Sequence, residues 1–285
     1  MNDTTDARRI RKEAIRRAWD ESAAGWNRHG GILHRWLSRA TDAMLEMAQV
    51  RPGARVLDVA AGAGDQTLAI ARRVGPSGQV VATDLSPAIL AFAQENARCA
   101  GLAQVTTRVA DAEESIGAED FDAVVCRLGL MLCPDPQAAV DAMFRALRSP
   151  GSACAMVFGR PERNPCVTTV MATACAHAGV PWLQPSQPGG LLSLGQPGLL
   201  DDMFRRAGFR DVATTWVDAP FELPSTADYL AFLRSSASPI QQLLARLDAP
   251  ARQAAWDDIA ARLDTFTTPQ GWRGPNELAL TVGRR

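Results

Sequence analysis

Residues 54–159 alternate short apolar runs with amphipathic segments, and this rhythm most constrains the fold. The apolar runs have the length and composition of buried parallel strands, whereas the segments between them have apolar residues at helical spacing. Strands that alternate with helices form a parallel sheet covered by helices on both faces. The spacing predicts strands at residues 54–60, 79–84, 104–110, 121–128 and 152–159.

The flanking regions complete the expected architecture. Residues 6–48 have a helical pattern that Gly30-Gly31 should break, and residues 212–223 and 278–285 supply two more strands. We therefore predict an α/β, Rossmann-like, seven-stranded and mostly parallel sheet. We expect an N-terminal helical segment over the site (1–50) and one main domain (51–285). Cover segments should lie over the carboxyl edge of the sheet, where such folds bind ligands, at about 160–196 and 226–265.

The basic residues exclude several enzyme classes. Of the 30 basic residues in this 285-residue chain, only Lys12 is a lysine, and it precedes any expected nucleotide site. P-loop proteins, pyridoxal enzymes and protein kinases all need a lysine in the site, so these classes are not expected. Short-chain dehydrogenases need a Tyr-x-x-x-Lys pair, but Tyr229 is the only tyrosine and no lysine follows it.

The net charge and the cysteines indicate which partners and which cellular compartment to expect. A net charge of −1 argues against a nucleic-acid partner, and no apolar run is long enough for a membrane span. The polar, helical N-terminal stretch does not resemble a signal peptide. Six cysteines without a CxxC spacing are typical of reduced thiols, so we expect a cytoplasmic protein. The sequence does not indicate an oligomeric state.

A glycine-rich turn follows the first strand. Asp58 ends the strand, and Gly62-Ala63-Gly64 leads into the next helix. Glycine permits a tight turn and a close approach of the backbone to a ligand, while a helix N-terminus favours negative charge. A dinucleotide fingerprint would need glycine at position 67, where this chain has Thr67. Twenty residues after Gly64, Asp84 ends the second strand, where a carboxylate can accept hydrogen bonds from ribose hydroxyls.

These features resemble the class I S-adenosylmethionine-dependent methyltransferases. Residues 58–64 resemble their motif I, with Ala60 in place of a usual glycine, and Asp111-Ala112-Glu113 follow the third strand, where the family contacts adenine. Over about residues 15–158 the chain is most similar to the ubiquinone/menaquinone C-methyltransferase family. The resemblance implies an S-adenosylmethionine site formed by Asp58, Ala60, Gly62, Gly64, Thr67, Asp84, Leu85, Asp111, Ala112 and Arg127.

The resemblance fades after the fifth strand. The family has a Glu-x-Ser signature there, and this chain has Val157-Phe158-Gly159-Arg160 instead. Because this is where an acceptor should bind, quinone specificity does not follow.

The acceptor chemistry rests on few candidate residues. A sulfonium donor is already activated, so the enzyme must align a nucleophile with the methyl group, and a base helps only a protonated acceptor. His29 and His177 are the candidate bases, although a histidine in such a position is more often a packing or surface residue; His34 matches a scaffold position of the family segment. We predict no metal site, because strand four ends without a group of carboxylates.

Two further groups of residues have open roles. Arg127 could contact the carboxylate of the cofactor or an anionic substrate, or form a salt bridge with a helix such as that of Asp141. Four tryptophans could line a flat aromatic-substrate pocket or belong to the core: Trp19, Trp26, Trp182 and Trp216.

We therefore predict an S-adenosylmethionine-dependent methyltransferase that acts on O, N or C of a small, aromatic or otherwise apolar metabolite. Two alternatives stay open. One is an NAD(P)-dependent oxidoreductase on a similar sheet, and the other is a non-catalytic protein that binds S-adenosylmethionine.

Overall fold

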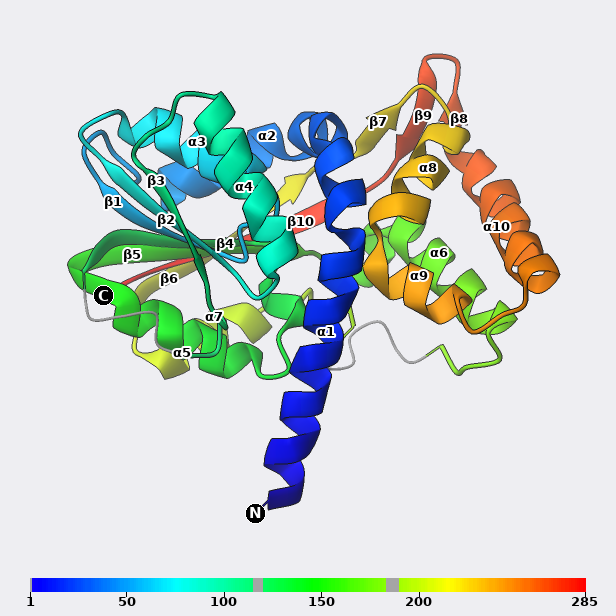
Figure 1. The fold of residues 1–285 in the computed structure, drawn as a ribbon, viewed down its shortest axis with the longest axis horizontal. Coiled ribbons are helices and arrows are strands. Elements are labelled where there is room, and N and C mark those ends of the chain that lie inside the picture. The colour runs from blue at the N-terminus through cyan, green and yellow to red at the C-terminus, as the bar shows by residue number, and fades with distance from the viewer. Residues whose placement is uncertain (1, 115–119, 183–189) are drawn as a thin grey trace.

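A seven-stranded sheet forms the centre of the molecule (Figure 1). The computed structural model describes residues 2–114, 120–182 and 190–285. The first five strands are parallel, and β10 runs antiparallel to both of its neighbours, β5 and β6. The predicted mostly parallel, seven-stranded α/β fold is confirmed. In spatial order the strands are β3 (Val105–Val109), β2 (Gln79–Asp84), β1 (Arg55–Val59), β4 (Phe121–Arg127), β5 (Leu147–Phe158), β10 (Glu277–Arg284) and β6 (Arg210–Asp218).

Helices cover both faces of this sheet. Figure 1 shows α2 (Gly30–Met47), α3 (Asp65–Val74) and α4 (Pro87–Cys99) over one face, and α5 (Pro136–Ala146) and α7 (Leu199–Ala207) over the other. The central strands β1 and β4 are almost completely buried, as expected for a parallel sheet covered on both sides. Local signals begin α4: Ser86 is the N-cap, its hydroxyl accepts the Ile89 N–H, and a proline follows it.

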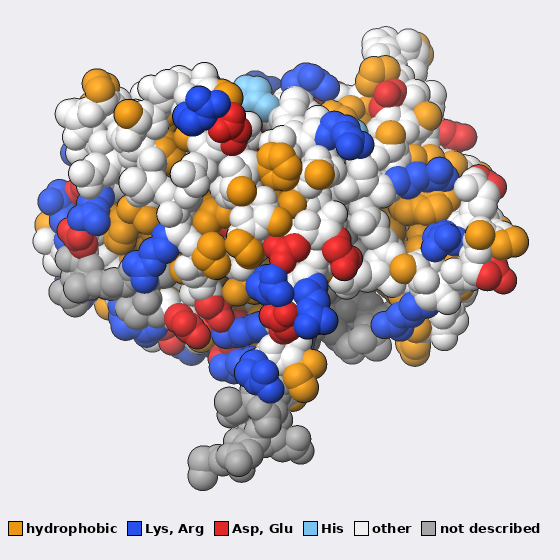
Figure 2. All heavy atoms as spheres, in the orientation of Figure 1, with side chains coloured by type: hydrophobic (Ala, Val, Ile, Leu, Met, Phe, Trp, Pro, Cys, Tyr) orange, Lys and Arg blue, Asp and Glu red, His pale blue; other side chains and the backbone are white. Residues whose placement is uncertain are grey.

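A long N-terminal helix, α1 (Asn2–Arg28), crosses the carboxyl edge of the sheet, and its N-terminal end projects beyond the body (Figure 1). The break after it falls at His29, so α2 already includes both glycines that were predicted to interrupt the helix. Trp19, Ala23 and Trp26 pack α1 onto the glycine-rich turn and the start of α4. Figure 2 shows basic and acidic side chains next to one another where α1 leaves the body.

The second half of the chain adds a helical cover and a small second sheet. The helices are α6 (Pro165–His177), α8 (Thr226–Ser236), α9 (Ser238–Leu244) and α10 (Ala249–Leu263), on the right of Figure 1. The small antiparallel sheet has the order β7 (Phe221–Leu223), β9 (Gly271–Gly274) and β8 (Thr267–Thr268). Single 3-10 turns lie at Leu130–Leu132, Pro161–Arg163 and Asp264–Phe266.

Two expectations about these elements were wrong. The single strand predicted at 212–223 is two strands in different sheets, because Pro220 has no N–H and the Ala219 N–H donates to Asn276 O (2.8 Å). The fifth strand also begins earlier than predicted, at Leu147. No helix among the described residues is long and apolar enough to cross a bilayer.

Candidate functional site: two adjoining cavities under helix α1

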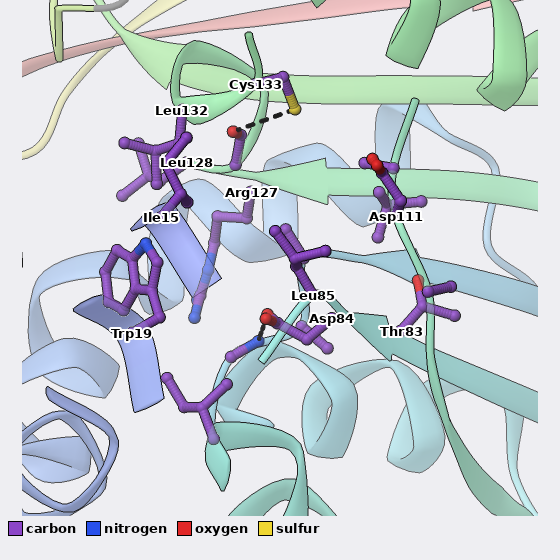
Figure 3. A pocket seen from close by; sticks show the side chains of 18 of the residues that line it. Ile15, Trp19, Thr83, Asp84, Leu85, Asp111, Arg127, Leu128, Leu132 and Cys133 are labelled. Atoms are coloured by element: carbon purple, nitrogen blue, oxygen red, sulfur yellow. Dashed lines mark hydrogen bonds between the residues drawn. The ribbon is translucent and has the colours of Figure 1, made fainter. Parts of the chain in front are cut away.

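A cavity opens at the carboxyl ends of β1, β2 and β4, beneath α1, and we call it the carboxyl-edge cavity. Figure 3 shows Ile15 and Trp19 of α1 on one side and Asp84, Leu85 and Asp111 on the other. Seven of the predicted cofactor residues line it among the residues that the structure describes: Ala60, Gly62, Asp84, Leu85, Asp111, Ala112 and Arg127.

The glycine-rich turn needs glycine for two separate reasons. Gly62 and Gly64 have φ values of +57° and +90°, in the left-handed region that favours glycine. A Cβ on Gly64 would lie 2.9 Å from the Cα of Ala93, so α4 approaches this turn too closely for a side chain. Gly64 is also the N-cap of α3, and the turn therefore holds the start of that helix against the cavity.

Asp84 connects the end of β2 to the glycine-rich turn. Its Oδ2 accepts the Gly62 N–H (3.0 Å) and its Oδ1 accepts the Ser86 N–H (2.9 Å). Burial raises the pKa of Asp84, and hydrogen bonds from backbone N–H groups oppose that shift. Each oxygen retains a further lone pair, so this fixed carboxylate can still accept hydrogen bonds from a ligand in the cavity.

Asp58 and Thr67 lie behind the cavity wall rather than in it. The Asp58 side chain is fully buried, the Thr67 hydroxyl donates to its Oδ2 (2.6 Å), and Gln66 Nε2 donates to its Oδ1. Burial raises the pKa of Asp58 to about 6, although both hydrogen bonds oppose the shift. These contacts tie β1 to the first turn of α3. Asp58, Gly64 and Thr67 do not line the cavity among the described residues, so their contact with a cofactor stays a prediction.

Arg127 lines the cavity but already has partners. Its Nη1 lies 2.9 Å from Asp65 Oδ2 and donates to Thr41 Oγ1 (2.8 Å), and only 8% of its side chain is exposed. The salt-bridge partner is thus Asp65 on α3, whereas the sequence suggested the helix of Asp141. This correction leaves open whether Arg127 also contacts a ligand.

Lys12 lies inside the cavity, which the sequence analysis did not predict. Its Nζ is 2.5 Å from Asp111 Oδ2 and 2.8 Å from Glu113 Oε2. Burial lowers the pKa of Lys12, but its hydrogen bonds and the charges of both carboxylates outweigh burial and raise it. The expectation that Lys12 lies outside the site was wrong, because α1 returns over the sheet edge and local sequence does not specify where a helix docks.

The candidate bases do not line this cavity among the described residues. His29 Nε2 lies 2.8 Å from Ser235 Oγ, its ring packs against Phe232, and burial, followed by the charge of Arg28, lowers its pKa. His177, the last residue of α6, pairs with Asp258 Oδ2 (3.1 Å). Their catalytic roles stay predictions. No group of three or more His, Cys, Asp or Glu side chains in the described ranges could hold a metal ion.

A second cavity, which we call the apolar cavity, lies between the carboxyl-edge cavity and the helical cover. It is lined by side chains of α1, α2, α6, α8 and α9 and of the strand ends. Four residues line both cavities: Trp19, Trp26, Leu128 and Leu132.

The tryptophans that line the apolar cavity are not the four that the sequence suggested. Trp36, which was not among the candidates, also lines the apolar cavity. Trp182 is exposed, and the Arg160 guanidinium lies over the ring of Trp216 (4.9 Å). The docking of the cover helices places Trp36 in a cavity wall, and a helical sequence pattern does not specify that docking.

Comparisons with known proteins fit this geometry. Residues 51–177 match the family described as "Methyltransferase domain". Over 145 residues the chain is 36% identical to a ubiquinone/menaquinone biosynthesis C-methyltransferase UbiE from Ectopseudomonas mendocina, which covers 50% of this chain and 55% of that protein. The chain spans about half the length of the curated relatives it matches.

Solved structures share the fold. The YcgJ protein from Bacillus subtilis superposes with a TM-score of 0.59 at 20% identity, over 87% of this chain and 98% of that one. Phosphoethanolamine N-methyltransferase 2 from Haemonchus contortus, solved with S-adenosyl-L-methionine, gives a TM-score of 0.53 at 18% identity, over 87% and 52%. These matches do not support the oxidoreductase or the non-catalytic alternative. Residues 51–177 therefore match a methyltransferase domain, and about half of the chain is similar to the ubiquinone/menaquinone C-methyltransferases.

Proposed function

We propose that the protein is an enzyme that transfers a methyl group from S-adenosylmethionine to O, N or C of a small, aromatic or otherwise apolar metabolite. The observation that carries this proposal is the pair of adjoining cavities. One has the fixed carboxylate and glycine turn of a nucleoside site, the other is apolar, and the two share a wall. A donor in the first cavity and an acceptor in the second would meet at that wall.

The residues of the carboxyl-edge cavity fit the donor. The spare lone pairs of Asp84 suit the two ribose hydroxyls, and Gly62, with a backbone but no side chain, leaves room beside them. Asp111 and Ala112 would hold the adenine, as the resemblance implies, with Lys12 fixing the Asp111 carboxylate. When bound, S-adenosylmethionine supplies a methyl group on a sulfonium, which makes that methyl group electrophilic.

The surrounding segments would orient the acceptor and exclude water. We assign this role to the N-terminal segment 1–50 and to the covers at about 160–196 and 226–265, of which residues 183–189 lie outside the description. The six cysteines are free thiols, which supports a reducing, cytoplasmic setting.

Calorimetric titration with S-adenosylhomocysteine tests the donor site. We expect binding near micromolar affinity, and Asp84→Asn should weaken it roughly tenfold or more, because a charge-assisted hydrogen bond contributes about 1.5–3 kcal/mol.

The matched control is Asp122→Asn. The Asp122 carboxylate also accepts a backbone N–H, that of Arg55 (2.7 Å), but it lies at the start of β4, at the opposite edge of the sheet. This variant should bind like the wild type. Absence of binding by the wild type, or equal losses in both variants, would contradict the proposed function.

A further inference from the structure

The apolar cavity contains almost no polar side chains. Among the described residues that line it, the side chains with a hydrogen-bond donor are Tyr229, Ser236 and three tryptophans, and the indole N–H of Trp36 donates to Ala219 O. None of the lining residues is Asp, Glu, Lys, Arg or His. Residues 183–189, which the structure does not describe, have no ionisable side chain in the sequence either.

The two hydroxyl groups of this cavity are not available as bases. The Ser236 hydroxyl donates to the backbone carbonyl of Phe232 within its own helix. Tyr229 is buried, and burial, together with the neighbouring Cys166, raises the pKa of its phenol well above the usual value. A phenol with a raised pKa stays protonated at neutral pH and does not accept a proton from an acceptor.

The titratable groups around the cavity are engaged elsewhere. The His29 ring packs against Phe232 and contacts Ser235, and the Cys166 thiol donates to Pro275 O (3.1 Å). Across the shared wall, the charged groups form pairs with one another or accept backbone N–H groups: Lys12, Asp84, Asp111, Glu113 and Arg127.

The Trp36 ring of the cavity is engaged by other aromatic rings. The Trp36 ring stacks on Phe221 (3.9 Å between centroids) and on Phe158 (6.0 Å), so other rings occupy space that a cation over its face would need. Ring faces attract cations, whereas ring edges carry partial positive charge. With no carboxylate in the lining, a product that kept a positive charge would lie in the cavity without a counter-charge.

We propose that the acceptor is an apolar aromatic compound whose phenol or thiol group ionises in water near neutral pH. We also propose that it binds as the anion without help from an enzyme base. This inference rests on the proposed function and names its substrate class. The proton stays in solvent before binding. A lone pair of the anionic oxygen or sulfur then forms the new bond to the methyl carbon, and the S–CH₃ bond breaks with its electron pair left on the donor sulfur. The positive sulfonium of the donor would be the counter-charge of the bound anion, and both products are neutral, which suits an apolar cavity.

Methylation of substituted phenols and thiophenols tests the proposal. The purified full chain is incubated with S-adenosylmethionine and 4-nitrophenol, phenol, 4-nitrothiophenol or thiophenol, and methylated product is quantified by mass spectrometry between pH 5 and 9. Below the pKa of each acceptor, kcat/KM should rise about tenfold per pH unit, and the inflection should move with the pKa of the acceptor. N,N-dimethylaniline is the neutral-amine comparison and should give at least tenfold less product than the best anion.

Three outcomes would overturn the proposal. The first is an inflection at the same pH for every acceptor, which would indicate an enzyme base. The second is a loss of kcat of more than tenfold in His29→Gln, whose ring contacts the cavity residue Phe232, without a similar loss in the matched His177→Gln. The third is preferred methylation of the amine, or no product from any phenol or thiol. Calorimetry with S-adenosylhomocysteine on the same sample separates the two proposals, because binding without product contradicts only the acceptor class, whereas absence of binding contradicts the proposed function itself.

Discussion

Replacing Lys12 by methionine should destabilise the folded protein much more than a surface substitution on the same helix. Methionine keeps the apolar stem of the side chain and removes only the charge. In the wild type this charge lies 2.5 Å from Asp111 and 2.8 Å from Glu113, and the side chain of Glu113 is only 3% exposed. The variant would leave two neighbouring carboxylates without their cation.

The magnitude follows from burial and distance. At an effective dielectric constant of about 20, two unit charges about 3 Å apart attract each other by roughly 5–6 kcal/mol before desolvation is counted. Desolvation of Lys12, whose side chain is 20% exposed, offsets much of this attraction. Breaking a fully buried pair costs about 3–5 kcal/mol, so we expect a loss of about 2–3 kcal/mol in the free energy of unfolding.

Urea denaturation at pH 7.5 measures this loss. The raised pKa of Lys12 means that its contribution is complete below the unfolded value of about 10.4 and is lost only as the pH rises through the higher folded value. The control is Arg8→Met, because Arg8 lies on the same helix as Lys12 and pairs with Asp135 while 49% of its side chain is exposed. That variant should lose less than about 1 kcal/mol. Equal losses in the two variants would refute the argument that Lys12 fastens α1 to the site.

Three other substitutions test the scaffold of the site. Burial raises the pKa of Asp58 to about 6, so between about pH 4 and 6 the folded state keeps a proton that the unfolded state releases. This difference lowers the stability of the wild type by up to about 3 kcal/mol by pH 7. In urea titrations, the unfolding free energy of Asp58→Asn relative to that of the wild type should therefore increase from pH 4 to pH 7. Gly64→Ala should lower the free energy of unfolding by about 2 kcal/mol or more, and more than Gly53→Ala, which has a similar φ but no close neighbour; equal losses would contradict the steric argument. Trp36→Phe leaves the Ala219 carbonyl without its 2.8 Å donor and should cost about 1–3 kcal/mol by thermal unfolding, whereas an unchanged midpoint would show that water replaces the indole.

The sheet and the glycine turn could be predicted because local signals specify them. Each strand of the parallel half is a short apolar run, and Ser86-Pro87 begins a helix by capping chemistry that depends only on nearby residues. The position of Asp84 at the end of the second strand then follows from strand length alone. Seven of the ten predicted cofactor residues therefore line the carboxyl-edge cavity among the described residues, and their contact with a cofactor stays a prediction.

The docking of α1 and of the cover helices could not be predicted in the same way. Lys12 enters the site through contacts with residues about one hundred positions away, and Trp36 enters a cavity wall through its stacking on Phe221. Such contacts depend on tertiary packing, which a single sequence does not reveal. The two-residue strand β8 and the four-residue strand β9 were missed because strands this short have no detectable periodicity.

Helix α1 makes the two cavities interdependent. Its Trp19 and Trp26 belong to both linings, and its Lys12 belongs to one, so a movement of this helix changes both binding sites together. In the proposed function, any factor by which the donor raises acceptor affinity must equal the factor by which the acceptor raises donor affinity. Partial detachment of α1 would therefore weaken the binding of both ligands at once. In this way a helix that precedes every strand in the sequence would control the thermodynamic coupling between donor and acceptor.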